Sequence, residues 1–204
     1  MILFLLAGIC VAYLIGSIPT GLIVGRLKGV DVRRQGSGNV GATNVARVVG
    51  KWPGLIVLII DILKGWFPVK VLSSLLVGWG VTLSPELTKI LFGVAAVGGH
   101  IWNPFLEFKG GKGVATSLGV LFGLSLPAAL GSMAIWVAAA VLTRYVSVAS
   151  SAAAIGAPFL MTFLNCPISW TFGAIAVGLS ILYRHRENFL RLMHREENRI
   201  GSRR

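Results

Sequence analysis

The sequence MILFLLAGICVAYLIGSIPTGLIVG, residues 1–25, contains no charged side chain. A helix that crosses the hydrocarbon core of a bilayer needs about 20 predominantly apolar residues, so this stretch predicts a transmembrane helix. No basic region precedes the apolar run and no small-residue cleavage site follows it, so we expect a retained span rather than a signal peptide.

The composition extends this prediction to the whole chain. Of its 204 residues, 55% are hydrophobic and 13% are charged, and the mean hydropathy is +0.80. A soluble domain usually carries about a quarter charged residues, so most of this surface must face lipid. No repeat, linker or low-complexity segment divides the chain. We expect residues 1–204 to form a single polytopic membrane domain, with 184–204 as a cytoplasmic C-terminal tail that contains a short helix.

Apolar segments at further places predict an all-α integral membrane protein. The expected spans lie near residues 1–25, 53–73, 86–106, 113–126, 128–143, 148–164 and 168–183. The fourth and fifth segments are short and flank Pro127. They form either two half-length helices or one long kinked helix, and this choice decides between seven spans and six.

The basic residues favour seven spans. Lys and Arg in short loops mark the cytoplasmic side of a membrane protein. With seven spans, 16 of the 19 basic residues fall on one side; they are Arg26, Lys28, Arg33, Arg34, Arg47, Lys51, Lys109, Lys112, Arg144, Arg184, Arg186, Arg191, Arg195, Arg199, Arg203 and Arg204. We therefore predict a seven-transmembrane-helix bundle with the N-terminus outside and the C-terminus in the cytoplasm.

The net charge of +12 has a second implication for ligands. A nucleic-acid-binding protein carries such charge over a soluble domain, whereas here it lies in short gaps between apolar runs. We expect no nucleic-acid partner and favour an anionic substrate at a lipid bilayer. Cys10 and Cys166 have neither metal-ligand nor redox spacing, so we expect two unpaired thiols and no metal or cofactor.

Residues 36–44, GSGNVGATN, form a first polar cluster, followed by Arg47. Its glycines let the backbone approach a ligand, its Ser, Thr and Asn side chains offer short donors, and Arg47 offers a bidentate fork for phosphate. A helix that starts near Gly41 would also point backbone N–H groups at an anion. The alternative is a flexible turn with capping residues. The candidate ligands in this cluster are Gly36, Ser37, Gly38, Asn39, Thr43, Asn44 and Arg47.

Residues 109–113, KGGKG, form a second cluster. The P-loop pattern requires a hydroxyl residue after its lysine, but Gly113 follows Lys112. A glycine cradle with a lysine at a helix N-terminus remains, which suits a phosphate without a metal. An ordinary loop at the membrane edge is the alternative.

Residues 183–188, YRHREN, form a third cluster at the end of the last predicted span. His185 and Asn188 are three residues apart and would share one helix face. Interfacial anchoring by Arg184 and Arg186 is the alternative explanation.

Asp61 and Lys64 stand out inside the second predicted span, and His100 lies toward the end of the third. Asp61 and Lys64 have the i, i+3 spacing of an ion pair, and charges within a membrane usually pair and face the bundle interior. We favour structural pairing, with support of the first cluster as the functional alternative. His100 either orients the site or packs.

The ordered set of motifs resembles the PlsY family of bacterial acyl-phosphate:glycerol-3-phosphate acyltransferases. The motifs appear here as GSGNVGATN with Arg47, as GHIWNPFLEFKGGKGVAT over residues 99–116, and as YRHREN. The resemblance spans nearly the whole chain. It implies a seven-helix bundle in the bacterial inner membrane, with a cytoplasmic site that transfers a fatty acyl group from acyl phosphate to glycerol 3-phosphate. The products would be lysophosphatidate and inorganic phosphate, and an enzyme that supplies acyl phosphate is a candidate partner.

The resemblance also implies residue roles. Ser37, Arg47, Lys112, His185 and Asn188 would hold the acceptor phosphate and neighbouring groups. Thr43 and Ser147 would line the site. A cradle for the donor phosphate would be made by Gly110, Gly111 and Gly113.

The chain lacks the His-x-x-x-x-Asp pair of soluble glycerophosphate acyltransferases, because Phe105, Leu190 and Arg199 stand at the aspartate positions. Acyl phosphate is already activated, so positioning and charge neutralisation would carry most of the catalysis. The acceptor's own phosphate, with a second pKa near ~6, is our favoured base, and His185 is the alternative.

A transporter and a non-catalytic membrane scaffold are the two alternative classes of protein. A transporter for a small organic anion would place binding residues near the midplane of repeated halves, which this sequence does not show. A non-catalytic scaffold would not need three phosphate-competent clusters. Acyl-chain preference and oligomeric state stay open.

Overall fold

The computed structural model describes residues 2–78 and 83–201. Within these two ranges every regular element is a helix, which confirms the all-α prediction. The contacts of the chain group into two compact units, Met1–Leu124 and Ser125–Arg204.

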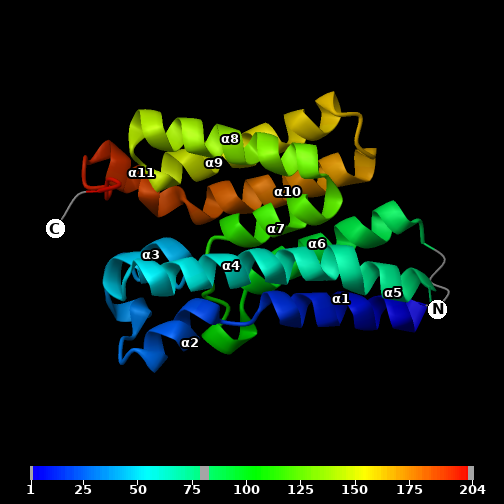
Figure 1. Ribbon diagram of the computed structural model, residues 1–204, viewed down its shortest axis with the longest axis horizontal. Coiled ribbons are helices and arrows are strands. Elements are labelled where there is room, and N and C mark those ends of the chain that lie inside the picture. Colours follow the sequence, from blue (N-terminus) through cyan, green and yellow to red (C-terminus); the bar gives the residue numbers. More distant parts are fainter. Residues whose placement is uncertain (1, 79–82, 202–204) are drawn as a thin grey trace. The chain divides into compact units, whose positions relative to one another are not determined.

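The first unit is built on two pairs of packed helices, α1 with α6 and α4 with α7 (Figure 1). Its elements in chain order are α1 (Ile2–Gly16), α2 (Thr20–Leu27), η1 (Val32–Arg34), α3 (Ala42–Val48), α4 (Lys51–Phe67), the π-helical η2 (Pro68–Leu72), α5 (Ser73–Gly78), α6 (Pro85–Ile101), η3 (Pro104–Leu106) and α7 (Val114–Leu124).

The apolar stretch over residues 1–25 forms two helices rather than one. Helix α1 ends at Gly16 and α2 begins at Thr20, directly after Pro19. Proline has no backbone N–H and its ring obstructs the preceding turn, so Pro19 interrupts the single helix that was expected over residues 1–25. The break exposes backbone carbonyls, including that of Ile18, to groups from other helices.

Glycines let the paired helices of this unit approach closely. A Cβ at Gly119 of α7 would overlap the carbonyl oxygen of Ile62 in α4, and a Cβ at Gly65 of α4 would overlap that of Thr116 in α7. Small residues at such contacts are typical of helices that pack within membranes, where close van der Waals contact drives association.

The second unit comprises α8 (Leu126–Thr143), α9 (Val146–Phe163), α10 (Ile168–Arg184) and α11 (Arg186–Met193). Helix α9 packs against both α8 and α10. The stretch around Pro127 forms two helices, because α7 ends at Leu124 and Ser125 caps α8 by accepting a hydrogen bond from the Ala128 N–H at 3.4 Å. Helix α11 confirms the short helix expected in the tail.

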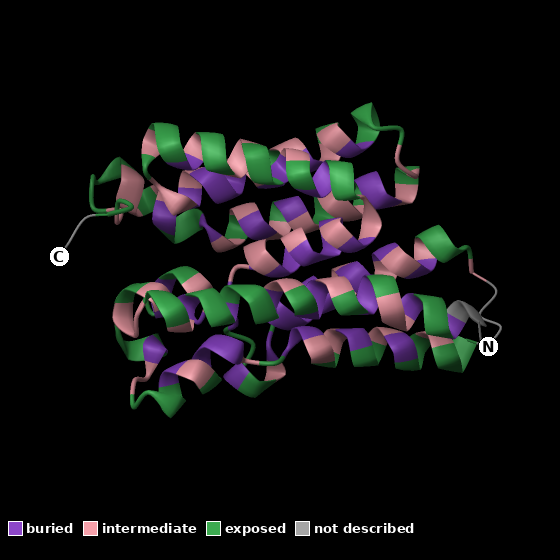
Figure 2. Ribbon diagram, in the orientation of Figure 1, coloured by how far each residue is buried: buried purple, intermediate pink, exposed green. Residues whose placement is uncertain are grey.

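Three helical stretches are long and apolar enough to cross a membrane, namely Ile2–Leu27, Leu126–Thr143 and Val146–Phe163. Two apolar helices, Val114–Leu124 and Ile168–Arg184, are shorter. Exposed residues recur along the outer faces of the helices (Figure 2). These faces carry large apolar side chains such as Leu142 and Phe163, which are 83% and 82% exposed, as expected of a surface that contacts lipid. Cys10 and Cys166 are unpaired, as predicted.

Candidate active site

The first polar cluster lies in the first unit, between η1 and α3, and a buried asparagine organises it. The Asn44 side chain donates hydrogen bonds to the carbonyl oxygens of Val32, Gln35 and Asn39 at 2.9, 3.1 and 2.9 Å. Its Oδ1 accepts from the Ser37 N–H at 2.8 Å. Four hydrogen bonds through one side chain make this an ordered loop, contrary to the alternative of a flexible turn.

Two glycines of this loop adopt backbone angles that disfavour other residues. Gly36 and Gly38 have φ of 60° and 68°. A Cβ at Gly36 would also overlap the Oδ1 of Asn44. Helix α3 begins at Ala42, as the sequence predicts, after Gly41 donates its N–H to Oδ1 of Asn39 at 2.8 Å.

The outward side chains of the first cluster are those with the chemistry to meet an anion. Ser37, Thr43 and Arg47 are exposed. Thr43 and Arg47 are four residues apart on α3 and share a helix face. Asn44 ties Ser37 to the first turn of this helix, so one short substructure carries all three.

A nearby arginine is already engaged by a carboxylate. Arg33 makes a 2.8 Å ion pair with Asp31, and hydrogen bonds from the Arg33 side chain and backbone hold the pKa of Asp31 far below its usual range. Within the part of the chain that the structure describes, Arg47 makes no hydrogen bond or ion pair. Arg47 is therefore the arginine of this cluster best suited to an incoming anion.

The second cluster is a loop that closes onto the end of α6. Gly110 donates its N–H to Ile101 O and Gly111 donates to His100 O, each at 3.1 Å. A Cβ at Gly110 would overlap the His100 carbonyl, and one at Gly111 would overlap the His100 ring. Close packing thus accounts for both glycines, and their N–H groups serve the fold.

Lysine side chains on this loop differ in environment. Lys112 is half-buried, whereas Lys109 is exposed and lies 3.8 Å from the Glu107 carboxylate in a surface ion pair. Gly113, with φ of 84°, precedes α7, and its carbonyl accepts from both the N–H and the hydroxyl of Ser117 at 2.8 and 2.7 Å. Lys112 therefore stands directly before a fixed helix start.

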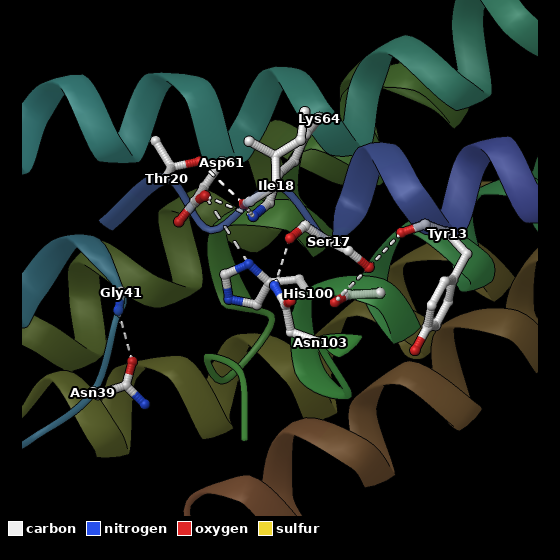
Figure 3. Close-up of polar contacts among 11 residues, drawn as sticks. Tyr13, Ser17, Ile18, Thr20, Asn39, Gly41, Asp61, Lys64, His100 and Asn103 are labelled. Atoms are coloured by element: carbon white, nitrogen blue, oxygen red, sulfur yellow. Dashed lines mark hydrogen bonds and ion pairs between the residues drawn. The ribbon is translucent and has the colours of Figure 1, made fainter. Parts of the chain in front are cut away.

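Asp61, Lys64 and His100 form a buried polar centre in the first unit (Figure 3). Asp61 and Lys64 in α4 form the predicted ion pair at 2.9 Å. The Lys64 ammonium also donates to the Ile18 carbonyl at 3.1 Å, at the break between α1 and α2. His100 Nδ1 lies 4.0 Å from Oδ1 of Asp61. These three residues line one small pocket with Val40 of the first loop.

The third cluster lies in the second unit. His185 and Asn188 are buried at the junction of α10 and α11. Nδ1 of His185 lies 2.8 Å from the Ile181 carbonyl oxygen. A carbonyl only accepts, so Nδ1 carries the proton in neutral imidazole and Nε2 carries the lone pair.

Sequence reasoning missed one residue of this unit, Glu197. Its Oε1 accepts from the Asn188 amide at 2.6 Å and the Ser147 hydroxyl at 3.0 Å, and its Oε2 accepts from Arg191 at 2.9 Å. Burial raises the pKa of Glu197, but the hydrogen bonds from Asn188, Arg191 and Ser147 outweigh it, so the net pKa is lowered. The structure thus brings together Ser147 and Asn188, two of the predicted site residues.

The fold and these loops define a helical membrane protein with polar, glycine-rich loops that suit phosphate-bearing ligands. The family model described as "Glycerol-3-phosphate acyltransferase" matches residues 6–195. The glycerol-3-phosphate acyltransferase of Aquifex aeolicus (strain VF5) is 45% identical over 93% of this chain and 95% of its own length. That of Prochlorococcus marinus (strain MIT 9312) is 43% identical over 95% and 96%.

Two solved structures of an integral membrane glycerol 3-phosphate acyltransferase, PlsY (YgiH), are 43% identical to this chain. The glycerol 3-phosphate form has a TM-score of 0.88 and covers 97% of this chain and 96% of its own. The lysophosphatidic acid form has a TM-score of 0.85 and covers 97% and 95%. The chain belongs to the glycerol-3-phosphate acyltransferase family and is a multi-pass membrane acyltransferase of phospholipid biosynthesis.

Proposed function

We propose that this acyltransferase uses acyl phosphate as its donor and glycerol 3-phosphate as its acceptor, and that it releases lysophosphatidate and inorganic phosphate. One observation supports the acceptor and the lipid product: the 43% identical PlsY was crystallised in forms named for glycerol 3-phosphate and for lysophosphatidic acid. The donor rests on the resemblance of the three motifs to the acyl-phosphate-dependent family. In this chain, Arg47 and Lys112 supply the cations that two phosphate-bearing substrates require.

The proposed reaction needs little chemistry from the protein. A hydroxyl oxygen of the acceptor attacks the acyl carbonyl carbon, the bond from that carbon to the phosphate oxygen breaks, and phosphate leaves with the electron pair. The hydroxyl proton passes to the acceptor's own phosphate, whose second pKa is near ~6. His185 Nε2 is the alternative base.

The residue roles proposed here are those that the family resemblance implies. Ser37, Arg47, Lys112, His185 and Asn188 are proposed to hold the acceptor phosphate and its neighbours. Asn44 and Glu197 hold Ser37 and Asn188 through hydrogen bonds. Further lining residues are proposed to be Gly36, Gly38, Asn39, Thr43, Gly110, Gly111, Gly113 and Ser147.

The proposal extends to placement in the cell. Seven spans in the bacterial inner membrane, with the N-terminus outside and the C-terminus in the cytoplasm, would place the basic loops on the side where soluble glycerol 3-phosphate is found. An enzyme that supplies acyl phosphate is the proposed partner.

The test compares donors for the purified protein in lipid vesicles. Acyl phosphate should support acyl transfer, acyl-CoA alone should not, and a chelator of divalent metals should leave the rate unchanged. Full activity with acyl-CoA, or loss of activity with the chelator, would overturn the proposal. Flux of labelled glycerol 3-phosphate into sealed vesicles without acylation would favour a transporter instead.

A further inference from the structure

We propose that Asp61, Lys64 and His100 form a buried positioning network that fixes the backbone from which Lys112 projects. The inference rests on the proposed role of Lys112 at the substrate phosphates. The three residues act through the loop that carries the lysine rather than by contact with the substrate.

The charges of α4 are unusually placed for residues that serve folding alone. Asp61 and Lys64 are 2% and 4% exposed, and both lie on a helix of a membrane protein. A charged side chain at the bilayer centre costs roughly 2.5–3.5 kcal/mol on insertion scales. Apolar residues of similar volume often replace a buried ion pair with no loss of stability. The presence of a buried ion pair here therefore points to a role beyond packing.

The ion pair joins α4 to the chain break in the first span. The Lys64 ammonium contacts Oδ1 of Asp61 at 2.9 Å and the Ile18 carbonyl at 3.1 Å. The segment between α1 and α2, residues 17–19, is thereby held against α4. From the same break, the Ser17 carbonyl accepts a hydrogen bond from the Asn103 amide at 2.6 Å, immediately after α6.

His100 connects this centre to the second loop. One edge of its ring faces Oδ1 of Asp61, with Nδ1 at 4.0 Å (Figure 3). The other edge lies so close to Gly111 that a Cβ there would overlap Nε2, and the His100 carbonyl accepts the Gly111 N–H at 3.1 Å. The imidazole is thus held between the α4 carboxylate and the residue that precedes Lys112.

The consequence is that a change at Asp61 should reach Lys112 through one ring and one peptide unit. A displacement of about 1 Å in a catalytic group can lower a rate by as much as about 10²-fold. We expect Asp61→Asn, which keeps the side chain's shape and removes its charge, to lower kcat at least about tenfold. The KM for glycerol 3-phosphate should change less than about threefold.

The experiment uses Asp61→Asn, a paired variant and a control in the full-length protein, together with Lys112→Ala and its combination with Asp61→Asn. Asp61→Asn leaves Lys64 without its carboxylate, whereas Asp61→Leu/Lys64→Met removes both charges and restores apolar packing. Thr88→Val is the matched control, because Thr88 is also fully buried in α6 and its hydroxyl donates locally, to the Ser84 carbonyl at 3.1 Å. Thermal unfolding, acyl transfer and hydrogen exchange of the peptide covering residues 109–113 are measured for each.

A positioning role predicts a split between stability and activity. The paired variant should recover wild-type thermal stability but keep the loss in kcat, and its 109–113 peptide should exchange faster. In a Lys112→Ala background, Asp61→Asn should lower the rate by less than about twofold further, because effects that act through one group do not add. Thr88→Val should leave exchange and kcat unchanged.

A purely structural role of the three residues predicts different results for these variants. The inference is wrong if the paired variant recovers both stability and activity, or if hydrogen exchange of residues 109–113 is unaltered. It is also wrong if the rate losses caused by Asp61→Asn and Lys112→Ala multiply in full in the double variant. An inactive wild-type protein would instead refute the proposed function, and the exchange measurement would still decide whether the network holds the loop.

Discussion

Individual side chains of the candidate site differ in their hydrogen bonds and in their exposure. Asn44 and Asn188 are hydrogen-bonded to the protein itself, the first to its own loop and the second to Glu197. Their chemistry maintains the shape of the site. Arg47 projects from α3 as an exposed cation, and Lys112 is held at the junction of a glycine loop and a helix. Because charge-assisted hydrogen bonds to phosphate are stronger than neutral ones, direct contact with phosphate is expected chiefly of Arg47 and Lys112.

The two lysines of the second loop provide a matched comparison. A charge-assisted hydrogen bond contributes roughly 1.5–3 kcal/mol, and each 1.36 kcal/mol is about tenfold in rate. Lys112→Ala should lower kcat/KM by at least about ten- to a hundredfold. Lys109→Ala should cost little, because Lys109 is exposed and its ion-pair partner Glu107 is exposed too. Equal losses in the two variants, measured as initial rates of acyl transfer, would remove the second loop from the site.

Glu197 gives a prediction for pH. Its pKa is lowered in the folded protein, so its contribution to stability is present above the ordinary glutamate pKa of about 4.3 and is lost as pH falls through the lower folded value. Glu197→Gln should lower the unfolding temperature at neutral pH and show a smaller further drop on acidification than the wild type. Thermal scans from pH 7 to pH 3 in detergent measure this. If the unfolding temperatures of the two proteins fall in parallel as the pH is lowered, the Glu197 carboxylate is not the group whose titration lowers stability.

At the scale of helices, sequence predicted those elements that depend on local pattern. Uninterrupted apolar runs revealed α8, α9 and α10, and the i, i+3 spacing revealed the Asp61–Lys64 pair. The break between α1 and α2 was missed, since no charge or glycine cluster marks it and Pro19 alone was insufficient. Glu197 was missed because it bonds Ser147 across 50 positions and stands among arginines in a tail that otherwise resembles a basic anchor.

Helix packing gives a second matched comparison. Gly119→Ala should destabilise the first unit, because its Cβ would overlap the Ile62 carbonyl of α4 and overpacking typically costs about 1–3 kcal/mol. Gly98→Ala in α6 should be neutral or stabilising, since its Cβ would meet Trp102 and Tyr13 at an ordinary 3.9 Å and alanine favours helix by about 1 kcal/mol. Unfolding temperatures in detergent compare the two. Equal effects would contradict close α4–α7 packing.

At the scale of the whole molecule, the basic residues determine the proposed orientation. Cysteines introduced at Arg34, at Lys109 and in the tail should resist an impermeant thiol reagent in intact cells and react after permeabilisation. Cys166, between α9 and α10, should react from outside. Labelling of the tail in intact cells would reverse the orientation and separate the basic loops from cytoplasmic glycerol 3-phosphate.

We propose that one acyl group moves from acyl phosphate to glycerol 3-phosphate at each turnover, without a further reactant. The direct measurement is the stoichiometry of the purified protein in vesicles supplied with these two compounds alone. We predict one inorganic phosphate and one lysophosphatidate for each glycerol 3-phosphate consumed. Phosphate release without lysophosphatidate, or lysophosphatidate formed only when another acyl donor is added, would contradict it.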